Sequence, residues 1–199
     1  MNKHCVYIQY SIQGCTAIHL KEKDSNVIPL TGVKGVIFDL DGTLVDCHLD
    51  FASIKNEVGC PSNEDLLSFA ERLPESHSKE VHDVILRHEL ADAAQSSWLS
   101  GAAEFVQQVK SAGLPMAIVT RNCRRATAMK IATNDIPIKT VVTREDAPAK
   151  PDPTALIMLA EQWQLECSAL LYIGDYIYDE QAAKNANMQF RYAPFGNPN

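Results

Sequence analysis

The chain has 199 residues, of which 46% are hydrophobic and 22% are charged, and its formal net charge is −7. This size and composition are typical of a globular protein with a hydrophobic core, built as one domain or as a core domain with a small insert. The acidic balance argues against binding nucleic-acid backbones or anionic membranes through bulk charge, although a local metal ion or lysine still allows a small phosphorylated substrate.

The N-terminal part of the chain is predicted to be an extension over residues 1–32. Two β-prone runs at 6–12 and 16–20 flank a glycine-containing connection, which favours a β-hairpin. No run has the apolar length of a signal peptide or a membrane span. Six cysteines are scattered without a CxxC pair, at positions 5, 15, 47, 60, 123 and 167. We therefore expect reduced thiols, no zinc site and a cytoplasmic location.

A short apolar run at 35–40 with an acidic residue, Asp39, near its end is typical of a buried parallel strand whose tip carries chemistry. From 46 to 98 the pattern becomes helical, with amphipathic helices predicted at 49–58 and 78–97. Between these two helices, Asn63 is predicted to be the N-cap of a shorter helix. The helical block is therefore predicted to be an insertion after the first core strand.

Strand and helix patterns alternate in the second half of the chain. Such alternation predicts an α/β fold with a doubly wound, mainly parallel sheet, and ligands of these sheets bind beyond the carboxyl ends of the strands. Helices are predicted at 102–112, 124–133, 152–164 and 178–187, and strands at 115–119, 138–142, 169–173 and 189–192.

Polar residues follow four of the predicted strands. They are Asp39, Asp41 and Thr43 after the first, Thr120 after the second, Lys150 after the third, and Asp175 and Asp179 after the fourth. Each alone has an ordinary explanation, because acidic residues at strand ends are commonly helix caps or solvated loop positions. Their joint placement at one edge of the sheet predicts a site.

Such a set of side chains suits phosphoryl transfer, which needs positioning and neutralisation of charge on the phosphoryl oxygens. Asp39 and Asp175 would supply carboxylate ligands to Mg²⁺, a hard cation that prefers oxygen. A carboxylate also suits the role of nucleophile, because an aspartyl-phosphate splits one hard step into two. Asp41 would then exchange protons with the leaving alcohol and the attacking water.

Four segments resemble the signature motifs of the haloacid dehalogenase-like hydrolases. The order of these segments and the gaps between them agree with that family, and the resemblance extends from about residue 33 to residue 192. The segments are FDLDGTLV at 38–45 (DxDGT), VTRN at 119–122, KPDP at 150–153 and GDYIYD at 174–179 (GDxxxD). The resemblance implies a core domain over 33–45 and 99–199. The insert at 46–98 resembles the small helical cap of the phosphoglycolate-phosphatase-like branch.

The resemblance also implies roles for the acidic residues. Asp39 would be the nucleophile and a metal ligand, and Asp175 would be the second carboxylate ligand of Mg²⁺. Asp41 would be the general acid and base, with its backbone carbonyl on the metal. Family members that dehalogenate 2-haloacids lack this second aspartate, so its presence favours phosphate esters.

The remaining motif residues would bind the phosphoryl group or support the site. Thr120 and Lys150 are the catalytic phosphate-binding pair implied by the resemblance. Thr43, Arg121 and Asn122 would add phosphate contacts. Gly174 would support the site, and Asp179 would orient Lys150 or a metal-bound water.

Alternative functions remain open from the sequence. A phosphosugar mutase would use the same aspartate pair, and a non-catalytic binding module would retain only the fold. A phosphonatase would need a Schiff-base lysine in the cap, for which Lys55 and Lys79 are available. We expect a small-molecule phosphate ester as the partner, no nucleic acid, no membrane, and a monomer or homodimer.

Overall fold

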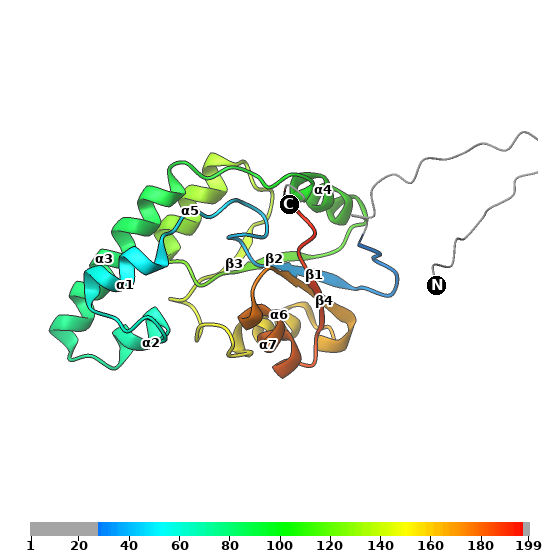
Figure 1. Ribbon diagram of the computed structural model, residues 1–199. Coiled ribbons are helices and arrows are strands. Elements are labelled where there is room, and N and C mark those ends of the chain that lie inside the picture. Colours follow the sequence, from blue (N-terminus) through cyan, green and yellow to red (C-terminus); the bar gives the residue numbers. More distant parts are fainter. Residues whose placement is uncertain (1–27, 197–199) are drawn as a thin grey trace, which may run out of the picture.

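The computed structural model describes residues 28–196, so the predicted N-terminal hairpin lies outside the described residues. A five-stranded parallel sheet forms the centre of the fold, in the order β3-β2-β1-β4-β5 (Figure 1). The strands are β1 (Gly35–Phe38), β2 (Met116–Val119), β3 (Thr140–Val142), β4 (Leu170–Gly174) and β5 (Gln189–Tyr192). The prediction of a doubly wound α/β fold is thereby confirmed.

Helices cover both faces of the sheet because its central strands are apolar on both sides. On β1, Val36 and Phe38 point into one core and Ile37 points into the other, and all three side chains are fully buried. Helices α4 (Ala102–Ser111) and α5 (Arg124–Thr133) cover the first face. Helices α6 (Thr154–Trp163) and α7 (Ile177–Asn185) cover the second, below the sheet in Figure 1.

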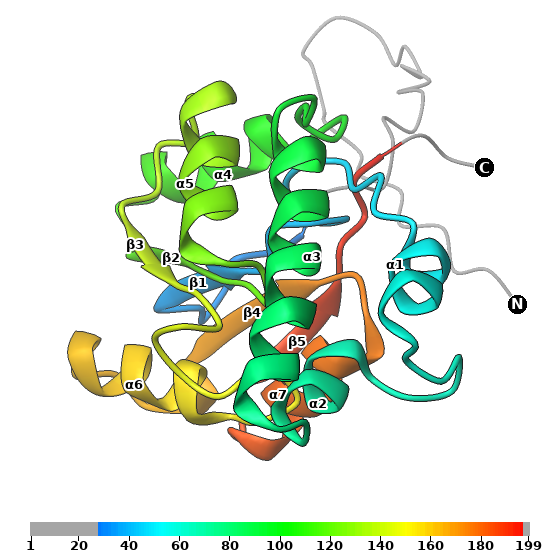
Figure 2. The ribbon, with the colours of Figure 1, turned by 90° about the vertical axis from the view of Figure 1, so that its left-hand side faces the viewer.

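The segment after β1 contributes three helices, α1 (Phe51–Val58), α2 (Leu66–Glu71) and α3 (Glu75–Ala93). These helices lie beyond the sheet, on the left in Figure 1 and toward the viewer in Figure 2. They enclose a small apolar cluster of Ile54, Cys60, Leu66, Leu67, Phe69, Ala70, Val81 and Ile85. We call residues 46–98 the insert.

The N-cap of α2 is Asp65 rather than the predicted Asn63, because the Asp65 carboxylate accepts the Ser68 N–H at 3.1 Å. Helix α3 begins three residues before its predicted start, directly after Pro74, whose φ of −55° is compatible with a helix start. Near its end, α3 packs against α5 through a second small cluster that contains Ala93 and Ala126.

The chain segment that enters the insert and the segment that leaves it lie side by side. The Asp46 carboxylate accepts hydrogen bonds from the Ser97 N–H at 2.8 Å and from the Ser97 hydroxyl at 2.7 Å. Val45 and Trp98 form an isolated antiparallel bridge next to this pair. The insert therefore leaves and re-enters the core at one place.

Candidate active site

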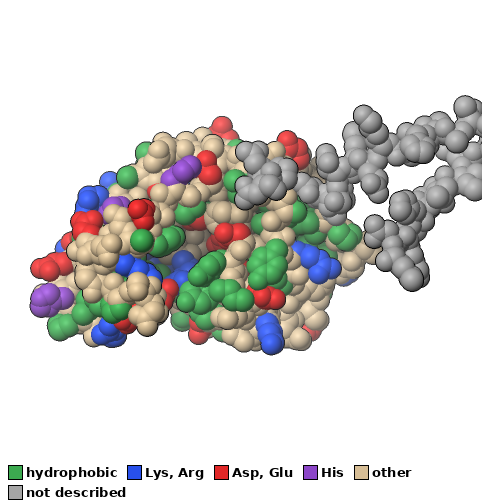
Figure 3. Space-filling model, viewed as in Figure 1, with side chains coloured by type: hydrophobic (Ala, Val, Ile, Leu, Met, Phe, Trp, Pro, Cys, Tyr) green, Lys and Arg blue, Asp and Glu red, His purple; other side chains and the backbone are tan. Residues whose placement is uncertain are grey.

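A cavity of about 520 Å³ lies between the insert and the carboxyl ends of the strands. Charged side chains occupy this hollow and hydrophobic side chains line its rim (Figure 3). Seven of the ten predicted site residues line the cavity, namely Asp39, Asp41, Arg121, Asn122, Lys150, Asp175 and Asp179. Thr43 and Thr120 lie buried beside them. The central strands β1, β2 and β4 are neighbours, which is why residues far apart in sequence meet here.

Lys150 is the centre of a buried charge network. Its Nζ pairs closely with Asp39 Oδ1, lies 2.6 Å from Asp179 Oδ1, and donates to Val119 O at 3.1 Å. The hydroxyl of Tyr172 accepts from the same Nζ at 2.9 Å and donates to Asp179 Oδ1 at 2.8 Å. Burial lowers the pKa of Lys150, but the two carboxylates outweigh burial and leave its pKa raised, so the side chain stays charged.

Tyr172 was not among the predicted site residues. It lies inside β4 and its side chain is fully buried. The available signal was a single hydroxyl within an otherwise apolar strand, two residues before the fourth motif, because a buried hydroxyl needs a hydrogen-bond partner.

The carboxylates of the site carry more negative charge than Lys150 can balance. Oxygen atoms of Asp39, Asp175 and Asp179 lie within 4.8 Å of one another. Burial raises the pKa of Asp39 well above its usual range, and the neighbouring aspartates raise it further against the effect of Lys150. Burial and Asp179 likewise raise the pKa of Asp175. This all-oxygen set with a deficit of positive charge fits a hard divalent cation.

Two glycines of the motifs allow these carboxylates to approach the backbone. Gly42 has a φ of +72°, and a Cβ at this position would lie 2.7 Å from Cγ of Asp175. A Cβ on Gly174 would lie 2.5 Å from the Asp179 side chain. Alanine at either position would therefore displace a site carboxylate.

Asp41 is held from two sides. Its Oδ2 accepts a short hydrogen bond from Asn122 Nδ2, and its Oδ1 pairs with Nζ of Lys130, a fully buried residue on α5. Burial raises the pKa of Asp41 to about 6, although Lys130 opposes this rise. A carboxyl group with a pKa near neutrality suits an acid and base catalyst. The sequence did not indicate Lys130, because helical lysines are usually exposed.

The hydroxyl of Thr120 accepts the Asn122 N–H at 3.1 Å, which orders the turn after β2. The buried Thr43 hydroxyl has no hydrogen-bond partner among the described residues. Arg121 extends toward the insert, where its guanidinium donates to both carboxylate oxygens of Asp65 at 2.8 and 2.7 Å. The guanidinium also stacks 4.9 Å above the Tyr178 ring, so Arg121 connects the insert to the core.

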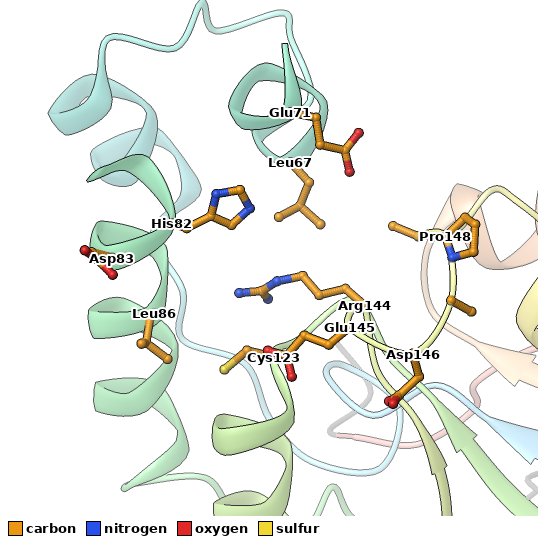
Figure 4. A pocket seen from close by; sticks show the side chains of 12 residues that line it. Leu67, Glu71, His82, Asp83, Leu86, Cys123, Arg144, Glu145, Asp146 and Pro148 are labelled. Atoms are coloured by element: carbon orange, nitrogen blue, oxygen red, sulfur yellow. The ribbon is translucent and has the colours of Figure 1, made fainter. Parts of the chain in front are cut away.

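A second cavity of about 500 Å³ opens between α2, α3 and the loop after β3 (Figure 4). Arg144 crosses it to reach α3, where it pairs with the buried Glu89, and it also donates to Arg121 O at 3.0 Å. No predicted site residue lines this second cavity. Its central cation is already paired, so the chemistry concentrates in the first cavity. Between residues 28 and 196, no helix combines the length and apolarity needed to cross a membrane.

Comparisons with known proteins identify the family. Residues 52–193 match the family described as haloacid dehalogenase-like hydrolase. A haloacid dehalogenase-like hydrolase domain-containing protein of Arabidopsis thaliana is 24% identical over 76% of this chain and 66% of its own length. A phosphoglycolate phosphatase of Thiobacillus denitrificans is 26% identical over 82% of this chain and 84% of its own. The structure of a hydrolase from Pseudomonas syringae superposes with a TM-score of 0.66 at 22% identity, over 79% of this chain and 83% of that one. The chain, as its four motifs predict, belongs to the haloacid dehalogenase-like hydrolase family.

Proposed function

We propose that this chain is a magnesium-dependent phosphatase that hydrolyses a small phosphorylated metabolite through an aspartyl-phosphate on Asp39. The observation that carries the proposal is the pair of carboxylates at the end of β1, with Asp39 bound to Lys150 and Asp41 at a pKa of about 6 two residues later. The phosphoglycolate phosphatase among the relatives supports the same class of reaction.

The side chains of Asp39 and Asp175 and the backbone carbonyl of Asp41 would hold Mg²⁺. Asp179 is engaged by Lys150 and Tyr172, which favours a supporting role for its carboxylate. When bound, Mg²⁺ would neutralise charge on the phosphoryl oxygens. Thr120 and Lys150 would bind the phosphoryl group.

The reaction would proceed in two steps. A carboxylate oxygen of Asp39 attacks phosphorus, the ester P–O bond breaks, and the leaving oxygen takes the proton of the Asp41 carboxyl group. In the second step, Asp41 takes a proton from a water molecule that attacks the phosphorus. The P–O bond to Asp39 breaks, inorganic phosphate leaves, and both side chains return to their starting protonation states.

We also propose that the insert acts as a cap that selects the leaving group, while 33–45 and 99–199 form the core. The cavity of about 520 Å³ is large enough for a small metabolite. Phe51 from the insert and Tyr176 from the core both line it, and these two residues are 54% and 57% exposed. Apolar surface on both sides of the entrance favours a leaving group with an apolar or ring-shaped part.

The decisive experiment is a screen of phosphorylated metabolites with and without Mg²⁺, followed by measurement of inorganic phosphate. Asp39→Asn should abolish turnover of every substrate found, because an amide cannot act as this nucleophile. Asp83→Asn, at an exposed position of α3, is the matched control and should retain activity. Wild-type turnover by Asp39→Asn would refute the proposal. An isomerised phosphosugar without released phosphate would identify a mutase instead.

A further inference from the structure

We infer that Lys130, which lies outside the four motifs, is a positioning residue that fixes the orientation of Asp41 and connects it to the end of the cap helix α3. This inference rests on the proposed function, because it assigns a role toward the group that would protonate the leaving oxygen. It goes beyond the motifs, since none of them contains Lys130 or its second partner, Asp92.

Lys130 is completely buried on α5. Its Nζ pairs closely with Asp41 Oδ1 and with Asp92 Oδ2, and the Asp92 side chain is only 3% exposed. Burying an ammonium group is costly unless charged and hydrogen-bonding partners compensate for the lost water. The two carboxylates therefore determine where the ammonium group lies.

The contact with Lys130 completes the hold on Asp41. Asn122 donates to one carboxylate oxygen and Lys130 to the other, so the plane of the group is fixed. Each carboxylate oxygen can accept two hydrogen bonds. Each Asp41 oxygen therefore keeps one free position, which can carry the proton that passes to the leaving group. Without Lys130, the last torsion of the Asp41 side chain would be restrained only by Asn122, and this torsion is intrinsically broad.

Asp92 carries the connection to the cap. It lies in the last turn of α3, and its Oδ1 accepts the backbone N–H of His48 at 2.7 Å. His48 belongs to the first segment of the insert, before α1, so Asp92 joins both ends of the insert to Lys130. A shift of α3 against α5 would change the partners of Lys130 and, through it, the orientation of Asp41.

A metal ion is not needed to explain this cluster. Ligand atoms of Asp41, Cys47 and Asp92 lie within 4.8 Å of one another, which is a spacing that a cation could bridge. The ammonium group of Lys130 already pairs with both carboxylates. We therefore assign the cluster to positioning rather than to metal binding.

The test compares Lys130→Met with the matched control Lys110→Met, the same change at an exposed position of α4. The value of kcat/KM is measured for an alkyl phosphate from the screen and for p-nitrophenyl phosphate, whose leaving group departs without a proton. This parameter reports the steps up to departure of the leaving group. Lys130→Met should lose roughly 100-fold or more on the alkyl ester but less than tenfold on the aryl ester. Lys110→Met should lose neither activity.

Both activities are measured on the same preparation of each variant. A fraction of unfolded protein lowers both activities equally and leaves their ratio unchanged. Equal losses on both esters, or no loss on either, would overturn the inference. If Lys130→Met is insoluble, the double variant Lys130→Met/Asp92→Asn is used instead, because it also removes the charge of the second buried carboxylate. The ratio of its activities on the two esters is the test. A wild-type chain without Mg²⁺-dependent turnover would instead refute the proposed function, which separates the two failures.

Discussion

Replacing Gly42 by alanine tests how closely the Asp175 carboxylate must approach the backbone at the proposed metal site. Gly42 has a φ of +72°, a conformation that costs an alanine about 1–2 kcal/mol. The new Cβ would lie 2.7 Å from Cγ of Asp175, whereas ordinary contact begins at 3.4 Å. Because a carboxylate oxygen of Asp175 lies nearer still, the group must retreat by at least about 0.7 Å, which Mg²⁺ tolerates poorly because its ligand distances are confined to about 2.0–2.1 Å.

The control is Gly59→Ala. Gly59 ends α1 with a φ of +68°, and no atom of the described chain lies within 4 Å of a Cβ placed there. It therefore reproduces the backbone strain of Gly42→Ala without the clash. Both variants should lose about 1–2 kcal/mol of unfolding free energy in urea. Only Gly42→Ala should raise the Mg²⁺ concentration needed for half-maximal phosphate release, by roughly tenfold or more.

Two results would refute this reasoning. A wild-type Mg²⁺ requirement in Gly42→Ala would show that the Asp175 carboxylate does not depend on the space above Gly42. An equal rise in Gly59→Ala would show that backbone strain, and not displacement of Asp175, is responsible.

Two further predictions concern the buried network and the connection between the insert and the core. Tyr172→Phe removes a hydroxyl that contacts Lys150 at 2.9 Å and Asp179 at 2.8 Å, and should lower the unfolding free energy by roughly 1.5–3 kcal/mol in urea. Tyr192→Phe, which removes an exposed hydroxyl bound to Glu180, is its control and should cost less than about 1 kcal/mol; equal losses would contradict a special role for Tyr172. Burial raises the pKa of Asp65, but donors from Arg121 and Ser68 outweigh burial and hold its pKa below the usual range. The stability that this carboxylate contributes should therefore be complete above the unfolded pKa of about 3.9 and disappear as pH falls through the lower folded pKa. Asp65→Asn keeps an N-cap oxygen but loses the ion pair, so its deficit in unfolding free energy relative to wild type, up to about 1 kcal/mol, should vanish in acid; a deficit that is independent of pH would contradict this account.

The regular parts of the fold followed from the sequence because their signals are local. Helix α5 and strand β5 have the predicted bounds, and the other core elements agree within a few residues. Apolar runs locate the strands, because parallel strands buried on both faces have an unbroken apolar pattern. The alternation of strand and helix patterns then indicates the fold class. The start of α2 was misplaced because Asn63 and Asp65 are equally good caps in sequence, and only the backbone selects between them.

Lys130 and Tyr172, which sequence reasoning missed, are both buried polar groups whose burial depends on distant parts of the chain. Lys130 is buried because α3 packs on α5, and Tyr172 because β4 lies between β1 and β5. The available signal for such partners is a charge count over the predicted site residues, which contain four aspartates but only two cations, Arg121 and Lys150. Buried carboxylates need donors or cations, so this excess predicts additional ones that the motifs do not name.

The structure shows which charged groups balance one another at the site. Five carboxylates surround Lys130, Lys150 and the proposed metal site, those of Asp39, Asp41, Asp92, Asp175 and Asp179. Lys130 and Lys150 supply two positive charges and a bound Mg²⁺ would supply two more, which leaves one negative charge in excess. A single retained proton would remove this excess. The pKa values of Asp39, Asp41 and Asp175 are all raised, but a bound cation would favour the ionised forms of its ligands Asp39 and Asp175, which leaves Asp41, with a pKa of about 6, to hold the proton. That is the protonation state a general acid requires before the leaving group departs, so the same charges that hold the site together also prepare it for the first step.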